Sequence, residues 1–233
     1  MVSFQKQNTG WEGILVVDKP RGMTSHDVVA VVRRRFHMRR VGHAGTLDPL
    51  ATGVLVVLVG KATKLFHEFE GFDKAYNATL LLGRKTTSAD IEGKVVAEAD
   101  FDHVSRGQFE EGLTHFRGPI EQTPPMVSAV KMNGRRLYEL ARKGVDVKRA
   151  ARKIRIDKLE TTQFDPPYVR VYLECSKGTY VRKLAEDIGD RLGCLACISE
   201  IQRTKVGPFT IDQAIPLQDI QPEHVQAWSP QGV

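Results

Sequence analysis

The chain has 233 residues, of which 41% are hydrophobic, and it carries a formal net charge of +6 with a pI near 9.3. This length and composition allow one medium-sized domain with an apolar core, or such a domain with a small appendage, and they exclude disorder throughout the chain. The positive charge favours a polyanionic partner, although a basic protein without such a partner would have the same composition.

No targeting or membrane segment is visible. No run approaches the roughly 18 apolar residues of a membrane span, and residues 1–12, which we expect to form a tail, hold no apolar signal-peptide core. We therefore expect a cytoplasmic protein. The odd number of cysteines, Cys175, Cys194 and Cys197, predicts reduced thiols. The last two have the spacing of half a zinc site, but no second pair follows, so we expect buried small hydrophobic residues instead.

The first elements of the chain are a strand and a helix. Residues 13–20 are an apolar run that Pro20 stops, which predicts a buried strand. Thr24 or Ser25 then caps a helix whose apolar positions extend to Phe36. In the turn between them we expect Lys19 and Pro20 to shape the loop rather than to act chemically.

A glycine-rich loop, Gly42–Gly53, precedes the apolar run Val54–Val59 and contains a single carboxylate, Asp48. A rigid loop at the mouth of a buried strand, with small residues on both sides of the acid, lets a ligand approach closely. Asp in glycine-rich sequence is also typical of an ordinary tight turn, so the loop alone leaves both interpretations open.

Two common site motifs are incomplete in the following segment. Gly60-Lys61-Ala62 lacks the Ser/Thr and the earlier glycine of a phosphate-binding P-loop, so ATP binding is not indicated. His67 begins like a zinc-protease helix, but Gly71 stands where the second metal ligand belongs. The segment therefore predicts neither chemistry.

The remaining elements follow from periodicity and from turn residues. Tyr76 falls in one of the expected strands, where a tyrosine is by default a packing residue. The patterns predict helices over 62–69, 101–116 and 135–143, strands over 74–83, 168–175 and 198–207, and a proline-stiffened extended segment over 122–131.

A further helix follows Gly178 and has apolar residues on one side from Val181 to Leu192. Its first turn holds Tyr180 and Arg182, which are free to point toward a site. Because an arginine is unfavourable at a helix N-terminus, we expect it to have a carboxylate partner, and Asp48 is the partner that we predict. The alternative is a plain surface cation.

Two groups of basic residues are candidates for contacts with an RNA backbone, because each cation near a phosphate releases counterions and adds affinity without sequence specificity. Simple solvated faces are the alternative. The two groups are Arg33, Arg34, Arg39 and Arg40 before the glycine-rich loop, and Lys148, Arg149, Arg152 and Lys153 in the later segment.

Four motifs together resemble the TruB family of bacterial tRNA pseudouridine synthases, and the similarity extends from about Gly13 to Leu217. The resemblance implies an α+β pseudouridine synthase fold, with a mixed, largely antiparallel sheet flanked by helices and loops and an active-site cleft. It implies a catalytic domain over 13–217, within which the density of basic residues predicts an RNA-binding insertion at about 118–155. In a departure from many family members, we expect 218–233 to be a short C-terminal tail without a full PUA domain. The motifs are residues 18–25, 42–64, 82–93 and 176–189.

The same resemblance implies isomerisation of uridine 55 in the T loop of tRNA by a monomer, without cofactor or metal. Asp48 matches the catalytic aspartate, Arg182 the arginine that pairs with it, and Tyr76 the tyrosine that stacks on the flipped base and is a candidate base for the final proton. Further substrate contacts are implied at His43, Tyr180 and Ile201.

The sequence departs from the family motif at one position in the last expected strand, and two alternative functions remain open. The chain has Ile201-Gln202-Arg203 where we expect a leucine followed by two arginines, so one RNA contact is expected to be missing. The first alternative function is a non-catalytic RNA-binding or RNA-folding module on the same scaffold. The second is a metal-dependent nuclease that uses Asp48 and His43, which would need further carboxylates in the loop.

Overall fold

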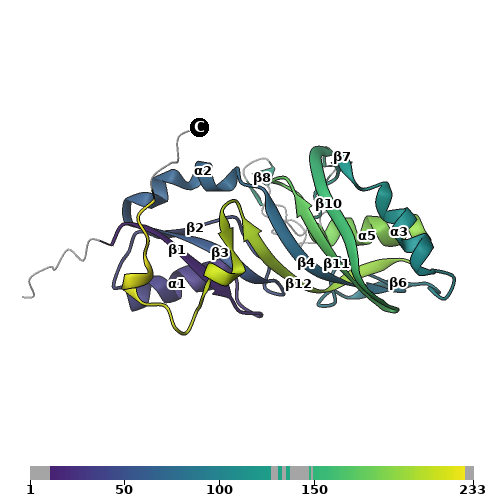
Figure 1. Ribbon diagram of the computed structural model, residues 1–233, viewed down its shortest axis with the longest axis horizontal. Helices are drawn as coiled ribbons and strands as arrows, with labels where there is room; N and C mark the ends of the chain where they lie inside the picture. The colour runs from purple at the N-terminus through teal and green to yellow at the C-terminus, as the bar shows by residue number, and fades with distance from the viewer. Residues whose placement is uncertain (1–10, 127–130, 133–134, 137–146, 148, 229–233) are drawn as a thin grey trace, which may run out of the picture. The chain divides into compact units, whose positions relative to one another are not determined.

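The structure is a computed structural model that describes residues 11–126, 131–132, 135–136, 147 and 149–228. It divides into two compact units, one made of Met1–Gly71 with Val206–Val233 and the other of Phe72–Lys205 (Figure 1). Among the described residues, the helices lack the length and hydropathy that a bilayer span requires.

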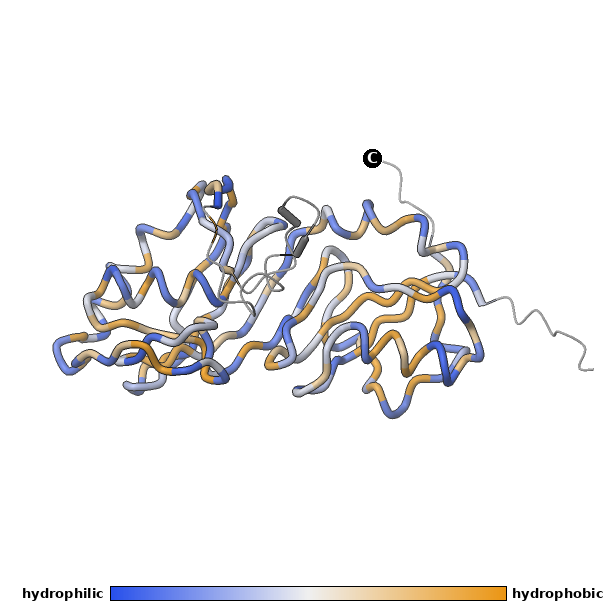
Figure 2. The backbone as a smooth tube through the Cα atoms, turned by 180° about the vertical axis from the view of Figure 1, so that it is seen from behind, coloured by the Kyte–Doolittle hydropathy of each residue, from blue (hydrophilic) through white to orange (hydrophobic). Residues whose placement is uncertain are grey.

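The first unit is built around two apolar strands, β1 and β3. Strand β1 pairs with β3 in antiparallel and with β14 in parallel, and β2 pairs with the other edge of β3. All residues of β3 beyond Thr52 are buried, which explains why it is a continuous apolar run rather than an alternating one; the same runs are orange in Figure 2. The strands are β1 (Gly13–Lys19), β2 (Val41–Ala44), β3 (Thr52–Val59), β13 (Phe209–Thr210) and β14 (Ile215–Pro216).

A capping box starts the main helix of this unit. Thr24 Oγ1 accepts the Asp27 N–H at 3.1 Å, and the Asp27 carboxylate accepts the Thr24 N–H at 2.8 Å. The helix expected over 62–69 is a 3-10 turn followed by one short α-helix. The helical elements are α1 (Ser25–Arg35), η1 (Gly60–Leu65), α2 (Phe66–Glu70), η2 (Ile211–Gln213) and η3 (Pro222–His224).

The C-terminal segment is fastened to this unit. Ile14 and Gln226 exchange backbone hydrogen bonds of 2.9 and 2.8 Å. The Trp228 ring lies 5.0 Å from Phe69 and 5.4 Å from Phe209, measured between centroids. Residues up to 228 in the expected tail therefore contribute to the packing of the first unit.

The second unit holds an extended sheet in the order β12-β4-β11-β10-β7, together with two small hairpins. The pairs β4–β11, β11–β10 and β10–β7 are antiparallel, and with the parallel pair β1–β14 they confirm the expected mixed sheet. The strands are β4 (Lys74–Leu82), β5 (Arg84–Thr86), β6 (Val95–Glu98), β7 (Gly118–Gln122), β8 (Lys131–Met132), β9 (Arg135–Arg136), β10 (Arg152–Asp165), β11 (Tyr168–Cys175) and β12 (Ala196–Val206).

Two long helices, α3 (Arg106–Thr114) and α5 (Val181–Leu192), pack together in this unit, and α5 also contacts β4. Their close approach depends on Gly112, where an added Cβ would lie 2.9 Å from Leu192 Cδ2. Helix α3 starts later than the expected residue 101, because Ser105 caps it in a box with Gln108.

The structure also tests the predictions for the cysteines, for a helix over 135–143 and for the RNA-binding insertion. The cysteines are all buried and free, as predicted. A helix over 135–143 is wrong at its start, because Arg135–Arg136 form strand β9, and residues 137–143 lie outside the described residues. At the two ends of the expected RNA-binding insertion, residues 118–122 and 152–156 pair with each other as β7 and β10, so these ends belong to the sheet.

Candidate active site

The loop that carries Asp48 is anchored by a buried lysine. Lys19, at the end of β1, is 0% exposed, and its ammonium group donates to the carbonyls of Pro20 at 2.8 Å, Met23 at 2.6 Å and Pro49 at 3.3 Å. The Gly22 N–H also donates to the Pro49 carbonyl, at 2.8 Å. This confirms the expected loop-shaping role of Lys19, which fixes the residue directly after Asp48.

Ser25, the first residue of α1, anchors the residue before Asp48. Its hydroxyl accepts the Leu47 N–H at 2.9 Å and donates to the Leu47 carbonyl at 3.2 Å, and both partners are buried. Asp48 itself is half-buried, and its carbonyl accepts the Ala51 N–H at 3.1 Å. An aspartate whose two neighbours are both held by buried side chains is pre-organised in the way that chemistry on a ligand requires.

His43 lies in β2, in the same unit as Asp48. Its ring is half-buried and stands edge-to-face against the exposed ring of His26, with the centroids 5.1 Å apart and the planes at 82°. His43 thus lies at the start of the glycine-rich loop, and its predicted substrate contact stays a prediction.

Arg182, in the first turn of α5, is 5% exposed and belongs to the second unit. Its Nη1 donates to the Ser88 carbonyl at 2.7 Å and pairs with Asp90 Oδ2 at 3.3 Å. The prediction that this arginine needs a carboxylate is confirmed by Asp90, which sequence reasoning did not single out. Its pairing with Asp48 stays a prediction.

Asp90 is itself held in a tight loop. Its Oδ1 accepts from the Ser88 hydroxyl at 2.6 Å and from the Glu92 N–H at 3.1 Å, which leaves Oδ2 to face Arg182. Between the two acceptors of the arginine, Ala89 has a left-handed φ of 59°, an uncommon conformation for a residue with a Cβ. The loop bridges to Ile198 of β12. These contacts orient the guanidinium.

The three other substrate candidates lie in the same unit as Arg182. Tyr76 stands opposite Leu173 in the β4–β11 pair and is 7% exposed, and Ile201 in β12 is 8% exposed. Tyr180 is half-buried and is the N-cap of α5. Their predicted contacts with a base stay predictions.

The sequence departure at Ile201-Gln202-Arg203 has a structural counterpart. Arg203 is 1% exposed and is the largest fully buried side chain among the described residues. A guanidinium at this depth belongs to the core and is out of reach of an RNA phosphate. Gln202, which stands where an arginine was expected, is half-buried.

The first basic group divides into two kinds of residue. Arg33 Nη2 donates to the Val41 carbonyl at 2.6 Å, and Arg40 Nε donates to Thr63 Oγ1 at 2.8 Å, so these two fasten α1 and η1 to their neighbours. All four residues are exposed. Their contacts with an RNA backbone stay predictions.

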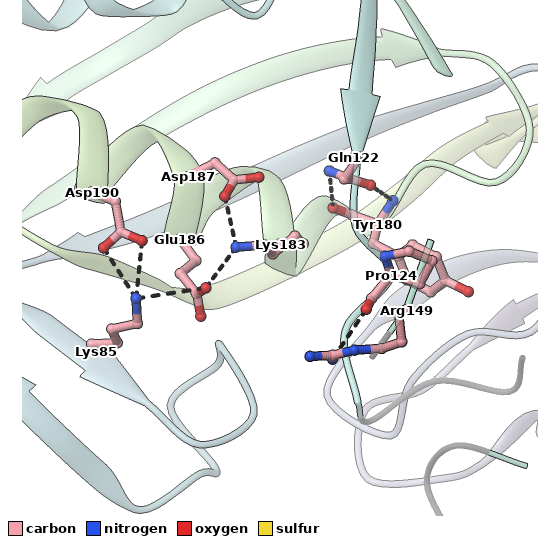
Figure 3. A network of polar contacts seen from close by, with 9 residues as sticks. All are labelled: Lys85, Gln122, Pro124, Arg149, Tyr180, Lys183, Glu186, Asp187 and Asp190. Carbon is pink, nitrogen blue, oxygen red and sulfur yellow. Dashed lines mark hydrogen bonds and ion pairs between the residues drawn. The ribbon is translucent and has the colours of Figure 1, made fainter. Parts of the chain in front are cut away.

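The second basic group lies around β10. Arg152 and Lys153 are exposed at the start of β10, whereas Arg149 is half-buried and donates to the Pro124 carbonyl at 3.2 Å (Figure 3). Lys148 lies outside the described residues. RNA contacts of this group stay predictions.

A pocket of about 680 Å³ opens in the second unit beside the first turn of α5, and its walls include Ser88 and Arg149. On the α5 side, Lys183 Nζ lies 2.7 Å from both Glu186 and Asp187 (Figure 3). Partial burial raises the pKa of the Asp187 carboxyl against the opposing effect of Lys183.

Three carboxylates on α5 lie close enough together to be compared with a metal site: Glu186, Asp187 and Asp190. Lysines already bind them, however, because Lys183 pairs with the first two and Lys85 Nζ lies 2.9 Å from Asp190 (Figure 3). We therefore interpret the group as a salt-bridge network on α5, of which Lys183, Glu186 and Asp187 line the pocket.

Comparisons with known proteins agree over most of the chain. The model of the TruB family pseudouridylate synthase N-terminal domain matches residues 33–181, and that of the tRNA pseudouridylate synthase B C-terminal domain matches residues 182–229. The tRNA pseudouridine synthase B of Symbiobacterium thermophilum is 51% identical over 90% of this chain and 71% of its own length. That of Pseudomonas aeruginosa is 46% identical over 97% of this chain and 74% of its own.

Solved structures show the same fold. The alignment with a chain in the crystal structure of a Cbf5-Nop10-Gar1 complex covers 90% of this chain and 53% of that chain, with a TM-score of 0.71 and 30% sequence identity. The structure of an H/ACA RNP bound to a substrate RNA containing 2'-deoxyuridine matches 92% of this chain and 54% of its own with a TM-score of 0.68 at 26% identity. With its family models and close relatives, the chain belongs to the TruB family of pseudouridylate synthases.

Proposed function

We propose that the protein isomerises uridine 55 in the T loop of tRNA to pseudouridine. Two curated relatives that match at least 90% of this chain are named tRNA pseudouridine synthase B. The observation that supports a catalytic role for Asp48 is the anchoring of its loop, because the buried side chains of Lys19 and Ser25 hold the residues on both sides of the half-buried Asp48.

The reaction suits a carboxylate. It breaks the bond between C1′ and N1 of the uridine, turns the uracil over and joins C5 to C1′, so nothing is oxidised and no group is added. An ionised Asp48 can attack C1′, attack the electrophilic C6 of the base, or assist elimination to a glycal. Each of these roles needs an ionised carboxylate, and the family resemblance assigns Arg182 as the residue that pairs with it.

The uridine must leave the RNA stack before it reacts. Tyr76 offers an aromatic face to the flipped base, and stacking of this kind contributes about 1–3 kcal/mol per base. Ile201 supplies an apolar wall that keeps the detached uracil from water. His43 contacts the RNA where the base has left, and Tyr180 contacts the uridine from the start of α5.

The RNA backbone is held by exposed cations, among which we include Arg34, Arg39, Arg152 and Lys153. Each phosphate contact releases counterions, so the affinity falls steeply as salt rises. The protein works in the cytoplasm as a monomer with tRNA as its partner, and the reaction as written requires neither a cofactor nor a metal.

The test incubates an unmodified tRNA transcript with the protein in EDTA and maps pseudouridine chemically along the whole transcript. The expected product is one pseudouridine at position 55, and it is absent when that uridine is replaced by cytidine. Binding without product would favour the non-catalytic RNA-binding module. Strand cleavage that appears only with added magnesium would favour the nuclease.

A further inference from the structure

Helix α5 lacks a cap of its own. Helices α1 and α3 each start with a Thr or Ser that closes a capping box, whereas the N-cap of α5 is Tyr180, whose side chain makes no capping hydrogen bond. The helix also begins with an arginine in its first turn, which its dipole disfavours. Local sequence therefore does not explain why α5 starts at Val181.

A side chain from strand β7 instead holds the backbone of the N-cap residue itself. Gln122 Oε1 accepts the Tyr180 N–H at 2.8 Å, and Gln122 Nε2 donates to the Tyr180 carbonyl at 3.1 Å (Figure 3). Gln122 is the last residue of β7 and is 3% exposed. One amide thus pairs with both backbone groups of the N-cap residue, as a neighbouring strand would.

This pairing demands an amide of this length. A carboxylate accepts but cannot donate, alanine does neither, and asparagine is one methylene shorter. The Tyr180 carbonyl also accepts the Leu184 N–H at 3.0 Å, which is the first hydrogen bond of the helix. This carbonyl therefore accepts from both the Gln122 amide and the helix backbone. A change at Gln122 therefore acts on the point where α5 begins.

Arg182 lies two residues beyond this point. Its guanidinium reaches two acceptors in a fixed loop, the Ser88 carbonyl and Asp90 Oδ2. A helix rises about 1.5 Å per residue, whereas N–H···O distances vary over only about 0.5 Å. If α5 began one residue earlier or later, Arg182 would therefore shift by more than its hydrogen bonds allow. Tyr180 moves with it.

We infer that Gln122 is a positioning residue for the reaction: by pairing with the backbone of Tyr180 it sets the start of α5, and with it the places of Tyr180 and Arg182. The inference rests on the proposed function, in which Arg182 acts with Asp48 and Tyr180 contacts the uridine. It concerns the rate of the chemical step rather than the binding of tRNA, because Gln122 is buried and faces protein.

The test compares Gln122→Ala with Gln108→Ala. Gln108 is the control at another helix start. Its amide oxygen accepts from the N–H and the hydroxyl of Ser105 in α3, where no proposed catalytic residue lies, and unlike Gln122 it is exposed. Single-turnover rates, tRNA affinity and hydrogen exchange are measured on both. We expect Gln122→Ala to lower the rate at least 10-fold, to change affinity less than 3-fold, and to speed exchange in residues 178–186, whereas Gln108→Ala keeps the wild-type rate.

A second variant keeps the inference testable should Gln122→Ala fail to fold, which circular dichroism at the assay temperature reveals. Gln122→Glu can both donate and accept only while its carboxyl is protonated, and burial raises the pKa of such a group. Its rate relative to wild type should therefore recover as pH falls.

Four outcomes would each overturn the inference: a rate within 2-fold of wild type for Gln122→Ala, a loss confined to tRNA affinity, an equal loss in Gln108→Ala, or a pH-independent deficit in Gln122→Glu. An inactive wild type would instead refute the proposed function, while the exchange of residues 178–186 still reports on Gln122.

Discussion

Replacing Asp90 by Asn removes one charge from a buried ion pair while it keeps the shape of the side chain. Arg182 and Asp90 expose only 6% and 7% of their side chains, with 3.3 Å between Nη1 and Oδ2. Removing one partner of a buried pair costs about 3–5 kcal/mol, because the remaining charge stays desolvated. The Ser88 carbonyl still accepts from the guanidinium at 2.7 Å, so we expect the lower end, about 3 kcal/mol.

The control is an exposed pair with similar geometry in the same unit. Arg84 Nη2 lies 3.0 Å from Glu98 Oε1, but the two side chains are 45% and 64% exposed. Exposed pairs contribute about 0–1 kcal/mol, so Glu98→Gln should change the free energy of unfolding by less than 1 kcal/mol. The difference between the two variants isolates burial.

Urea denaturation followed by circular dichroism measures both changes. For a chain of this size about 3 kcal/mol also corresponds to a fall in Tm of roughly 6–12 °C. Raising the salt concentration should shrink the effect of Glu98→Gln more than that of Asp90→Asn, because salt screens exposed charges. Equal and small effects of the two variants would refute the reasoning that burial makes the Arg182–Asp90 pair important.

Three further predictions concern the anchor of the Asp48 loop, the thiols and the RNA contacts. Lys19→Met removes the ammonium donor from three backbone carbonyls, of which only that of Pro49 keeps a second donor in the Gly22 N–H, so it should cost more than about 2 kcal/mol of unfolding free energy in urea and reduce pseudouridine formation; unchanged values would contradict the anchoring role. Burial raises the pKa of the Cys175 thiol to about 11, so mass spectrometry should find it unlabelled by iodoacetamide at pH 8 until denaturant is added. The unfolded thiol also loses its proton first, so this group's stabilisation should be present below pH 9 and be lost as pH rises through 11. Arg39→Ala should weaken tRNA binding and lower the salt slope by about 1, and an unchanged slope would remove Arg39 from the interface.

Sequence reasoning predicted best the strands and helices whose apolar residues all lie on one buried face. The alternating run of β11 and the one-sided apolar face of α5 reproduce the burial of Val169, Val171 and Leu184. The start of α3 was missed although Ser105 and Gln108 form a recognisable capping box. The strand pairing of β7 with β10 joins residues that are 30 (Gln122 and Arg152) to 38 (Gly118 and Ile156) positions apart, which no local pattern contains.

Sequence reasoning predicted the part of the site in which a functional residue and the residues that position it belong to recognisable motifs. Asp48 and the loop-shaping role of Lys19 come from neighbouring motifs that the fold brings together in one unit. The partner at Asp90 was anticipated in kind but not in identity, because the dipole argument demands a carboxylate without saying which one. Gln122 escaped notice because a single buried amide has no signature in sequence, and only the structure shows its two bonds to Tyr180.

Asp48→Asn tests whether the Asp48 carboxylate carries out the isomerisation. Asp212→Asn is the matched control, because Asp212 is an exposed aspartate in the same unit. Both variants and wild type are incubated with an unmodified tRNA transcript, and pseudouridine is mapped while tRNA affinity is measured in parallel. We predict that Asp48→Asn binds the transcript and forms no pseudouridine, whereas Asp212→Asn matches wild type. Pseudouridine formed by Asp48→Asn at the wild-type rate would contradict the account.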